Sequence, residues 1–272
     1  MGGPVADPAS HDAGGARTVL DHVAIGTRVV ADGWQLFAGL LGGTWAYGGY
    51  SPGFWWGQVR FRAGAKVELI TPTAGPDAGF LERFLDARGA GPHHLNFIVP
   101  DIEQTLARIT ALGIEPVQVS LQNPRWKEAF LHPRDAFGIV IQVAEQSGPP
   151  PELSPPDLFP ASGPASSFDL IEHHVADIDR ATRLFAAALE GEVAASADGS
   201  GTATVELTWQ NGARLRLVQP PAPSQHAADA AGSLHFARAS APFSPDDRAA
   251  AAELSRRLGI SLQLGGEARV TP

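Results

Sequence analysis

Residues 80–114 read FLERFLDARGAGPHHLNFIVPDIEQTLARITALGI, a run that predicts a helix, a strand and a second helix in succession. In its centre Leu95, Phe97 and Val99 alternate with polar residues, which is typical of a strand with one packed face. The opposite face then carries His94. The last third has apolar residues at helical spacing and an Asp at its start suited to cap a helix.

Three other segments predict strands of the same kind, each with one side chain capable of binding a metal on its polar face. They are LDHVAIG with His22, KVELITP with Glu68 and IVIQVAEQ with Gln142. Two imidazoles and a carboxylate are a recurrent ligand set for divalent transition metals. Together with His94 these residues indicate an open barrel with a metal in its hollow, although a single His or Glu in such a strand more often has a structural or solvated role. His93 points to the other face, where we expect a structural role.

The N-terminal half resembles the vicinal oxygen chelate superfamily, which includes glyoxalase I, methylmalonyl-CoA epimerase, extradiol dioxygenases and antibiotic-resistance proteins. The resemblance rests on LDHVAIG, VELITP, residues 80–114 and AFLHPRDAFGIVIQV, and it is greatest for methylmalonyl-CoA epimerase and related glyoxalase-like domains. It implies an α+β fold of tandem vicinal-oxygen-chelate domains, in which paired βαβββ modules form cupped, barrel-like mixed sheets. It also implies a metal inside the cup, with four ligand positions that fall on His22, Glu68, His94 and Gln142.

The site departs from the epimerase pattern, which has a carboxylate where this chain has Gln142. A Gln side chain can coordinate through its carbonyl oxygen, but it is neutral and cannot transfer a proton. Moving a proton between the two faces of a carbon usually takes two acid–base groups, and residues 33–67 contain no Asp or Glu. We therefore expect Glu68 to serve both as a ligand and as the catalytic carboxylate.

The chain repeats itself weakly on either side of a segment rich in Pro and Ser. LDHVAIG is echoed by EHHVADI, VELITP by LRLVQPP, and HHLNFIV by SLHFARA. The echoes predict four parts: a disordered leader at 1–17, a glyoxalase-like domain with the metal site at 18–146, a Pro/Ser-rich linker at 147–167, and a degenerate, metal-free glyoxalase-like domain at 168–272.

The second copy is expected to lack a metal because one ligand position has changed its chemistry. Aligning the repeats pairs the imidazoles of the two halves: His174 with His22, and His235 with His94. At the position of Glu68, however, stands Arg216. A guanidinium cannot ligate a metal, and its charge repels a divalent cation. We also expect no strand with a fourth ligand after SLQLGGEARVTP.

Aromatic residues are concentrated between positions 45 and 56, among Gly, Ser and Pro. They predict either core packing or a mobile lid over the cup. Trp126 is flanked by two cations and lies in a loop that lines the pocket in the superfamily; a cation there suits a carboxylate or phosphate, or is simply solvated. The residues predicted to bind substrate are Trp55, Trp56, Gln58, Asn96, Arg125 and Trp126.

The composition argues against several classes of partner. The chain has 272 residues, with 29 acidic and 20 basic side chains and no Cys. We therefore expect no nucleic acid or anionic membrane surface as partner, and no disulfide or Cys nucleophile. No apolar run approaches the roughly 20 residues of a membrane span, and the leader lacks the apolar core of a secretory signal. A cytoplasmic monomer or homodimer with a small-molecule substrate is expected.

The leading functional hypothesis is a metal-dependent isomerase, epimerase or lyase that acts on a small carbonyl or acyl substrate through a metal-stabilised enolate. Its cofactor would be a divalent metal ion: Zn, Ni, Co, Mn or Fe. One alternative is an Fe(II)-dependent, extradiol-type dioxygenase on the same ligands. Others are a non-catalytic, resistance-type protein that binds a small molecule, and a catalytically inactive scaffold.

Overall fold

The computed structural model describes residues 17–148, 154–157, 159–199, 201–221, 231–238 and 242–265. Apart from Arg17, the predicted leader lies outside the described residues. So do parts of the predicted linker and the end of the predicted second domain. Among the described residues, no helix has the length and apolar character needed to cross a membrane.

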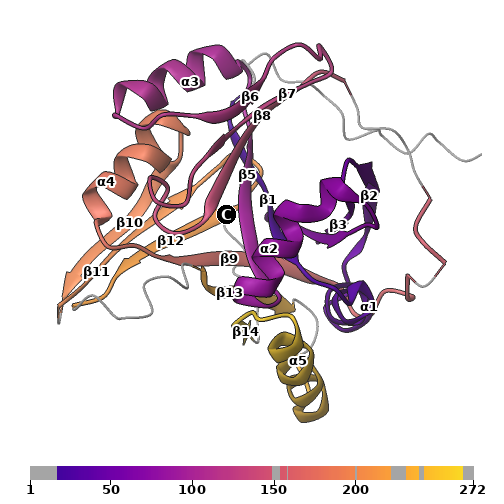
Figure 1. The fold of residues 1–272 in the computed structure, drawn as a ribbon. Helices are drawn as coiled ribbons and strands as arrows, with labels where there is room; N and C mark the ends of the chain where they lie inside the picture. Colours follow the sequence, from indigo (N-terminus) through magenta and orange to yellow (C-terminus); the bar gives the residue numbers. More distant parts are fainter. Residues whose placement is uncertain are drawn as a thin grey trace, which may run out of the picture.

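The first sheet is built from two βαβββ units. The first unit contains β1 (Val19–Gly26), α1 (Val30–Trp34), the π-helix η1 (Gln35–Leu40), β2 (Thr44–Ser51), β3 (Phe54–Arg60) and β4 (Lys66–Pro72). The short helix η2 (Pro76–Ala78) and α2 (Gly79–Arg88) lead into the second unit, which contains β5 (Gly91–Ile98), α3 (Ile102–Ala111), β6 (Val117–Ser120), β7 (Trp126–Leu131) and β8 (Val140–Gln146). The strand order is β2-β3-β4-β1-β5-β8-β7-β6, with the two units joined where β1 pairs antiparallel with β5 (Figure 1).

The second sheet repeats this plan, with a shorter second unit within the described residues. Its elements are β9 (Ser166–His174), α4 (Ile178–Thr182), the π-helix η3 (Arg183–Ala188), β10 (Glu192–Gly199), β11 (Thr202–Thr208), β12 (Arg214–Gln219), β13 (Ala231–Arg238), α5 (Pro245–Arg257) and β14 (Leu262–Gly265). They form a six-stranded sheet in the order β10-β11-β12-β9-β13-β14. The predicted α+β class with tandem βαβββ units is thereby confirmed.

The helix predicted after the central strand is confirmed as α3. The Asp101 side chain accepts a hydrogen bond from the backbone N–H of Gln104 at 2.9 Å, which satisfies one of the free donors at the helix start. Ile102 and Ile109 are buried on the side that faces the sheet. Local sequence signals and packing therefore agree for this element.

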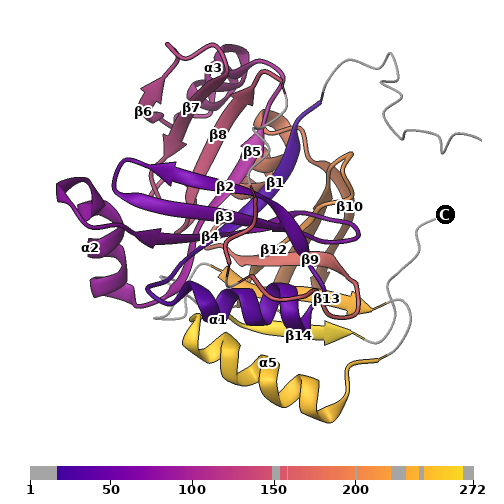
Figure 2. The same ribbon diagram turned by 90° about the vertical axis from the view of Figure 1, so that its right-hand side faces the viewer.

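The two sheets share one hydrophobic core. Phe97 of β5 packs against Phe185 of η3 and against Trp209, with ring centroids 5.9 and 5.4 Å apart. On the other side of the core, Phe61 lies 4.9 Å from Phe236 of β13. Figure 2 shows α1 beside α5, so helices of one half also pack on helices of the other. The second half therefore completes the core of the first.

The end of the predicted linker packs on the first unit. Phe159 lies against Trp34 with ring centroids 5.2 Å apart, and the Ser162 hydroxyl donates to the carbonyl of Gly43 at 2.8 Å. β9 then begins at Ser166, two residues before the predicted boundary. This contact ties the connection between the halves to the core instead of leaving it in solvent.

Candidate metal centre

Both histidines of the proposed site lie beside an extra residue in their strands. Where β1 pairs with β5, the register shifts between Leu20 and His22, which makes Asp21 the extra residue of β1. A second shift makes His93 the extra residue of β5, next to His94. Such β-bulges bend a strand and re-aim neighbouring side chains. Here each bulge brings a side chain onto the adjacent imidazole.

The first imidazole is held by a carboxylate. Nδ1 of His22 lies 2.8 Å from Oδ2 of Asp21, whose other oxygen is 2.9 Å from Nζ of Lys66. Burial acts to raise the pKa of Asp21, but the His22 hydrogen bond and the Lys66 charge outweigh it and lower the pKa to about 2. An ionised carboxylate only accepts, so Nδ1 of His22 donates and Nε2 keeps its lone pair.

The second imidazole is held by its neighbour. Nδ1 of His94 lies 2.9 Å from Nδ1 of His93. Burial lowers the pKa of His93 to about 4 and that of His94 well below its usual value, so both rings are neutral near pH 7. When His94 donates from Nδ1, its Nε2 presents a lone pair. His93 packs against Phe84 of α2 as a structural residue would, but it also contacts the site, which the expected orientation did not include.

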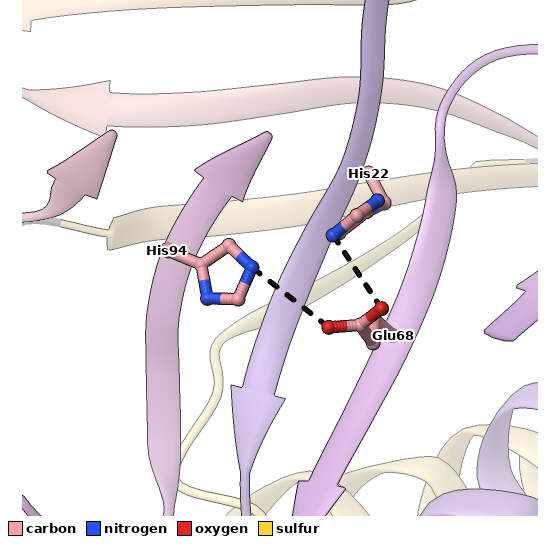
Figure 3. A group of neighbouring side chains, drawn as sticks. All are labelled: His22, Glu68 and His94. Atoms are coloured by element: carbon pink, nitrogen blue, oxygen red, sulfur yellow. Dashed lines mark ion pairs between the residues drawn. The ribbon is translucent and has the colours of Figure 1, made fainter. Parts of the chain in front are cut away.

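The two imidazoles converge on Glu68 of β4 (Figure 3). Nε2 of His22 lies 3.6 Å from Oε2 of Glu68, and Nε2 of His94 lies 3.8 Å from Oε1. One donor atom from each residue lies within 4.8 Å of the other two. All three side chains are buried, and Nε2 of Gln58 donates to Oε2 of Glu68 at 2.7 Å. Three neighbouring strands thus place three donors around one point.

The donor set fits a divalent cation. Nε2 of His22 and Nε2 of His94 are buried and have no hydrogen-bond partner among the described residues. Leaving such an atom unsatisfied costs roughly 1–3 kcal/mol. The spacing to the carboxylate is too long for a hydrogen bond, yet it is close to the separation of about 3.4 Å between ligands that bind Zn²⁺ tetrahedrally at 2.0–2.2 Å. A cation would satisfy both nitrogens and the carboxylate together.

Gln142, the predicted fourth ligand, lies on the same face of the sheet. It pairs with Asn96 where β8 runs parallel to β5. Its Nε2 donates to Oε2 of Glu128 at 2.8 Å, and Nε1 of Trp126 donates to the same oxygen at 2.9 Å. Glu128 was not predicted. The signal available in the sequence was that Glu128 is two residues from Trp126, which places both side chains on one face of the same strand.

The structure brings some of the predicted substrate-binding residues to the site and leaves others elsewhere. Asn96 is fully buried, and neither its Oδ1 nor its Nδ2 has a partner among the described residues; the same holds for Oε1 of Gln58. Trp126 donates a hydrogen bond to Glu128, which in turn accepts one from Gln142. Trp56, two residues from Gln58 on the same face of β3, packs against Tyr47. Two residues are not brought to the site: Trp55, which packs on Trp34 in the core, and Arg125, which is exposed.

The register of the second sheet corrects the pairing of the repeats. Arg216 pairs with Glu172 as Glu68 pairs with Ala24, so Arg216 does occupy the place of Glu68. Two residues back from Glu172 on the same face, however, stands Leu170, in the place of His22. The predicted match of His22 with His174 was therefore wrong by four residues.

The other histidine match was wrong by two residues. Ser233 pairs with Glu172 as His94 pairs with Ala24, so Ser233 occupies the place of His94 and His235 that of Asn96. Both bulges recur in the second sheet, where Asp169 and Gly232 are the extra residues. The second sheet thus has the same strand register at these positions. Leu170, Arg216 and Ser233 stand there in place of the three donors of the first sheet.

The place of the carboxylate is filled by an ion-pair network. Arg216 donates to Oε2 of Glu206 at 3.1 Å, and Arg214 pairs with Glu206 and with Asp169. Glu206 and Arg216 occupy the positions of Gln58 and Glu68 in the first sheet. Asp169 and Arg214 likewise occupy the positions of Asp21 and Lys66. Within the described residues, His22, Glu68 and His94 form the only group of His, Asp and Glu side chains close enough to share one ion.

Comparison with known proteins agrees with this architecture. No curated protein matches the chain in sequence. A mutant of 4-hydroxymandelate synthase from Streptomyces coelicolor has a similar fold, with a TM-score of 0.59 and 15% identity over 89% of this chain and 74% of the synthase. Methylmalonyl-CoA epimerase from Mycobacterium tuberculosis is 23% identical over 47% of this chain and 88% of the epimerase, with a TM-score of 0.43. Residues 21–130 match the sequence model of the "Glyoxalase/Bleomycin resistance protein/Dioxygenase superfamily". The resemblance to that superfamily predicted from the sequence is thus confirmed for residues 21–130.

Proposed function

We propose that the protein is a metal-dependent enzyme of the isomerase, epimerase or lyase type that acts on a small carbonyl or acyl compound. The main support is the convergence of two unpartnered imidazole nitrogens and a carboxylate in the interior of one cup. His22, Glu68 and His94 would hold the cation, with Gln142 as a fourth ligand. A divalent cation held there supplies Lewis acidity toward a carbonyl oxygen.

Glu68 is the carboxylate best placed to move a proton. Its Oε2 accepts the Gln58 amide, whereas Oε1 faces His94 at 3.8 Å with no closer donor among the described residues. Oε1 is therefore the atom that would take a proton from a carbon next to the carbonyl. Both imidazoles have their Nδ1 atoms engaged by Asp21 and His93, which orients the rings and keeps them out of proton transfer.

Asn96 and Gln58 are proposed to recognise the substrate. Their unpartnered amide atoms are buried beside the donors, so they need a polar ligand or water to be satisfied. Nδ2 of Asn96 can donate to a substrate oxygen, and Oε1 of Gln58 can accept from a hydroxyl or amide. This pair suits a compound that carries oxygen atoms on adjacent carbons.

The Fe(II) dioxygenase remains a second candidate because of one observation. Two histidines and one carboxylate on one side of a metal are the ligand set of non-haem Fe(II) oxygenases. The chemistry of His22, Glu68 and His94 therefore suits either metal role. The two functions differ in metal identity and in oxygen consumption.

Metal analysis of protein purified without added metal is the first test. We expect about one divalent ion per chain, lost in His22→Ala, and exchange of deuterium from solvent into the carbon next to the carbonyl of one member of a panel of small carbonyl and acyl compounds. Glu68→Gln should abolish the exchange. Stoichiometric iron with substrate-dependent oxygen uptake would favour the dioxygenase. Absence of bound metal, with small-molecule binding unchanged in His22→Ala, would overturn both enzymes in favour of a binding protein.

A further inference from the structure

The carboxylate of Glu128 on β7 accepts hydrogen bonds from two side chains. Its Oε2 accepts from Nε1 of Trp126 at 2.9 Å and from Nε2 of Gln142 at 2.8 Å. An indole nitrogen can only donate, and an ionised carboxylate can only accept. The indole therefore holds the carboxylate in one orientation, and the carboxylate selects which end of the Gln142 amide faces it.

The amide of Gln142 has one acceptable orientation as a result. If it were turned over, two oxygens, one from Gln142 and one from Glu128, would lie 2.8 Å apart with no hydrogen between them. With the NH₂ group against Glu128, Oε1 of Gln142 is directed away from β7.

The register places Gln142 on the face of the sheet that carries the metal centre. Asn96 pairs with Gln142 on one side and with His22 on the other, and His94 is two residues from Asn96 on the same face of β5. Gln142 thus lies on the same face of the sheet as the two imidazoles, on the strand next to β5. Phe130 pairs with Gln142 on the far side, so Glu128 approaches it diagonally from β7.

We propose that Glu128 is a positioning residue that fixes Gln142 as a ligand through Oε1 and holds a negative charge one hydrogen bond from that ligand. The inference rests on the metal-dependent function proposed above. The Gln142 amide is neutral, so Glu68 is the sole charged group among the four donors. A carboxylate that accepts from the Gln142 N–H polarises the amide and makes its oxygen a better ligand.

The test measures Co²⁺ and Zn²⁺ affinity of the metal-free full chain by competition with a chelator. Glu128→Leu is expected to weaken binding by about 10–100-fold, the usual effect of losing a partner that orients a ligand. Glu128→Gln keeps an acceptor oxygen and should restore most of the affinity. Glu145→Gln is the matched control, because Glu145 lies on β8 but pairs with Lys127 on the opposite face of the sheet.

A double-mutant comparison separates positioning from general destabilisation. If Glu128 acts through Gln142, adding Glu128→Leu to Gln142→Ala should change the affinity by less than about 2-fold, and the visible absorption of bound Co²⁺ should change in Glu128→Leu but not in Glu145→Gln. Wild-type affinity in Glu128→Leu, or a full effect in the Gln142→Ala background, would overturn the inference and leave the proposed function intact. Failure of the wild-type chain to bind either ion, with His22→Ala no different, would overturn the proposed function, and this inference with it.

Discussion

Replacing Asp21 with Asn tests how the metal centre holds its first imidazole. Asp21 is a largely buried carboxylate between Nδ1 of His22 and Nζ of Lys66, at 2.8 and 2.9 Å. Despite the opposing effect of burial, these partners lower its pKa from 3.8 to about 2, which is equivalent to about 2 kcal/mol of folding free energy. We expect metal-free Asp21→Asn to lose about this much stability at pH 7.

The same carboxyl gives the prediction a pH window. Its pKa is lower in the folded chain than in the unfolded chain, so the stabilisation is present above about pH 4 and is lost as the pH falls through about 2. Urea denaturation of the metal-free protein at pH 7, and in steps from pH 5 to pH 2, measures both effects. The variant should lose less stability than the wild type across that window.

A surface carboxylate provides the control. Asp86 pairs with Arg28, but its side chain is 73% exposed, so Asp86→Asn should cost less than about 1 kcal/mol. If Asp21→Asn were as stable as the wild type at pH 7, and both proteins lost stability equally below pH 4, the reasoning about the His22–Asp21–Lys66 contacts would be refuted. The metal affinity of Asp21→Asn should also fall, by about 10-fold.

Three further predictions follow from the site and the shared core. His94→Ala should abolish stoichiometric Zn²⁺ binding, whereas His235→Ala, at the position of Asn96, should leave it unchanged; metal analysis of both variants checks this. Phe97→Ala should destabilise the protein by about 3–5 kcal/mol, because its ring packs against Phe185 and Trp209 of the other half, yet denaturation should remain a single transition. Two separate transitions would contradict a common core. Removing metal with a chelator should lower the melting temperature, since a cation at about 100 times its Kd adds about 2.7 kcal/mol; equal melting curves with and without metal would contradict a native metal site.

The side of each strand that faces the cup could be predicted from the sequence. Alternation along a strand is a local property, so His22, Glu68, His94 and Gln142 were assigned to one face from their apolar neighbours alone. The structure places all four on that face. Local signals were likewise sufficient for the helix that begins after Asp101.

Contacts that depend on the pairing between strands were not predicted. Asp21 and His93 reach the imidazoles because the register shifts at those residues, and a shift of this kind leaves no pattern within one strand. Glu128 was missed because its role depends on Gln142, on the neighbouring strand. The repeat alignment failed for a related reason: a slip of two or four residues keeps a side chain on the same face, so His174 and His235 preserved the alternation without occupying the ligand positions.

The recurrence of both bulges in the second sheet has a consequence for engineering. The second cup already holds Asp169 and Arg214 in the arrangement that Asp21 and Lys66 have in the first. A chain carrying Leu170→His, Arg216→Glu and Ser233→His would therefore place the same three donors at the equivalent positions of the second sheet. Uptake of a second equivalent of Zn²⁺ by that triple variant would show that the second sheet lacks only these three side chains for metal binding. The protein would then be a scaffold for a catalyst with two metal centres.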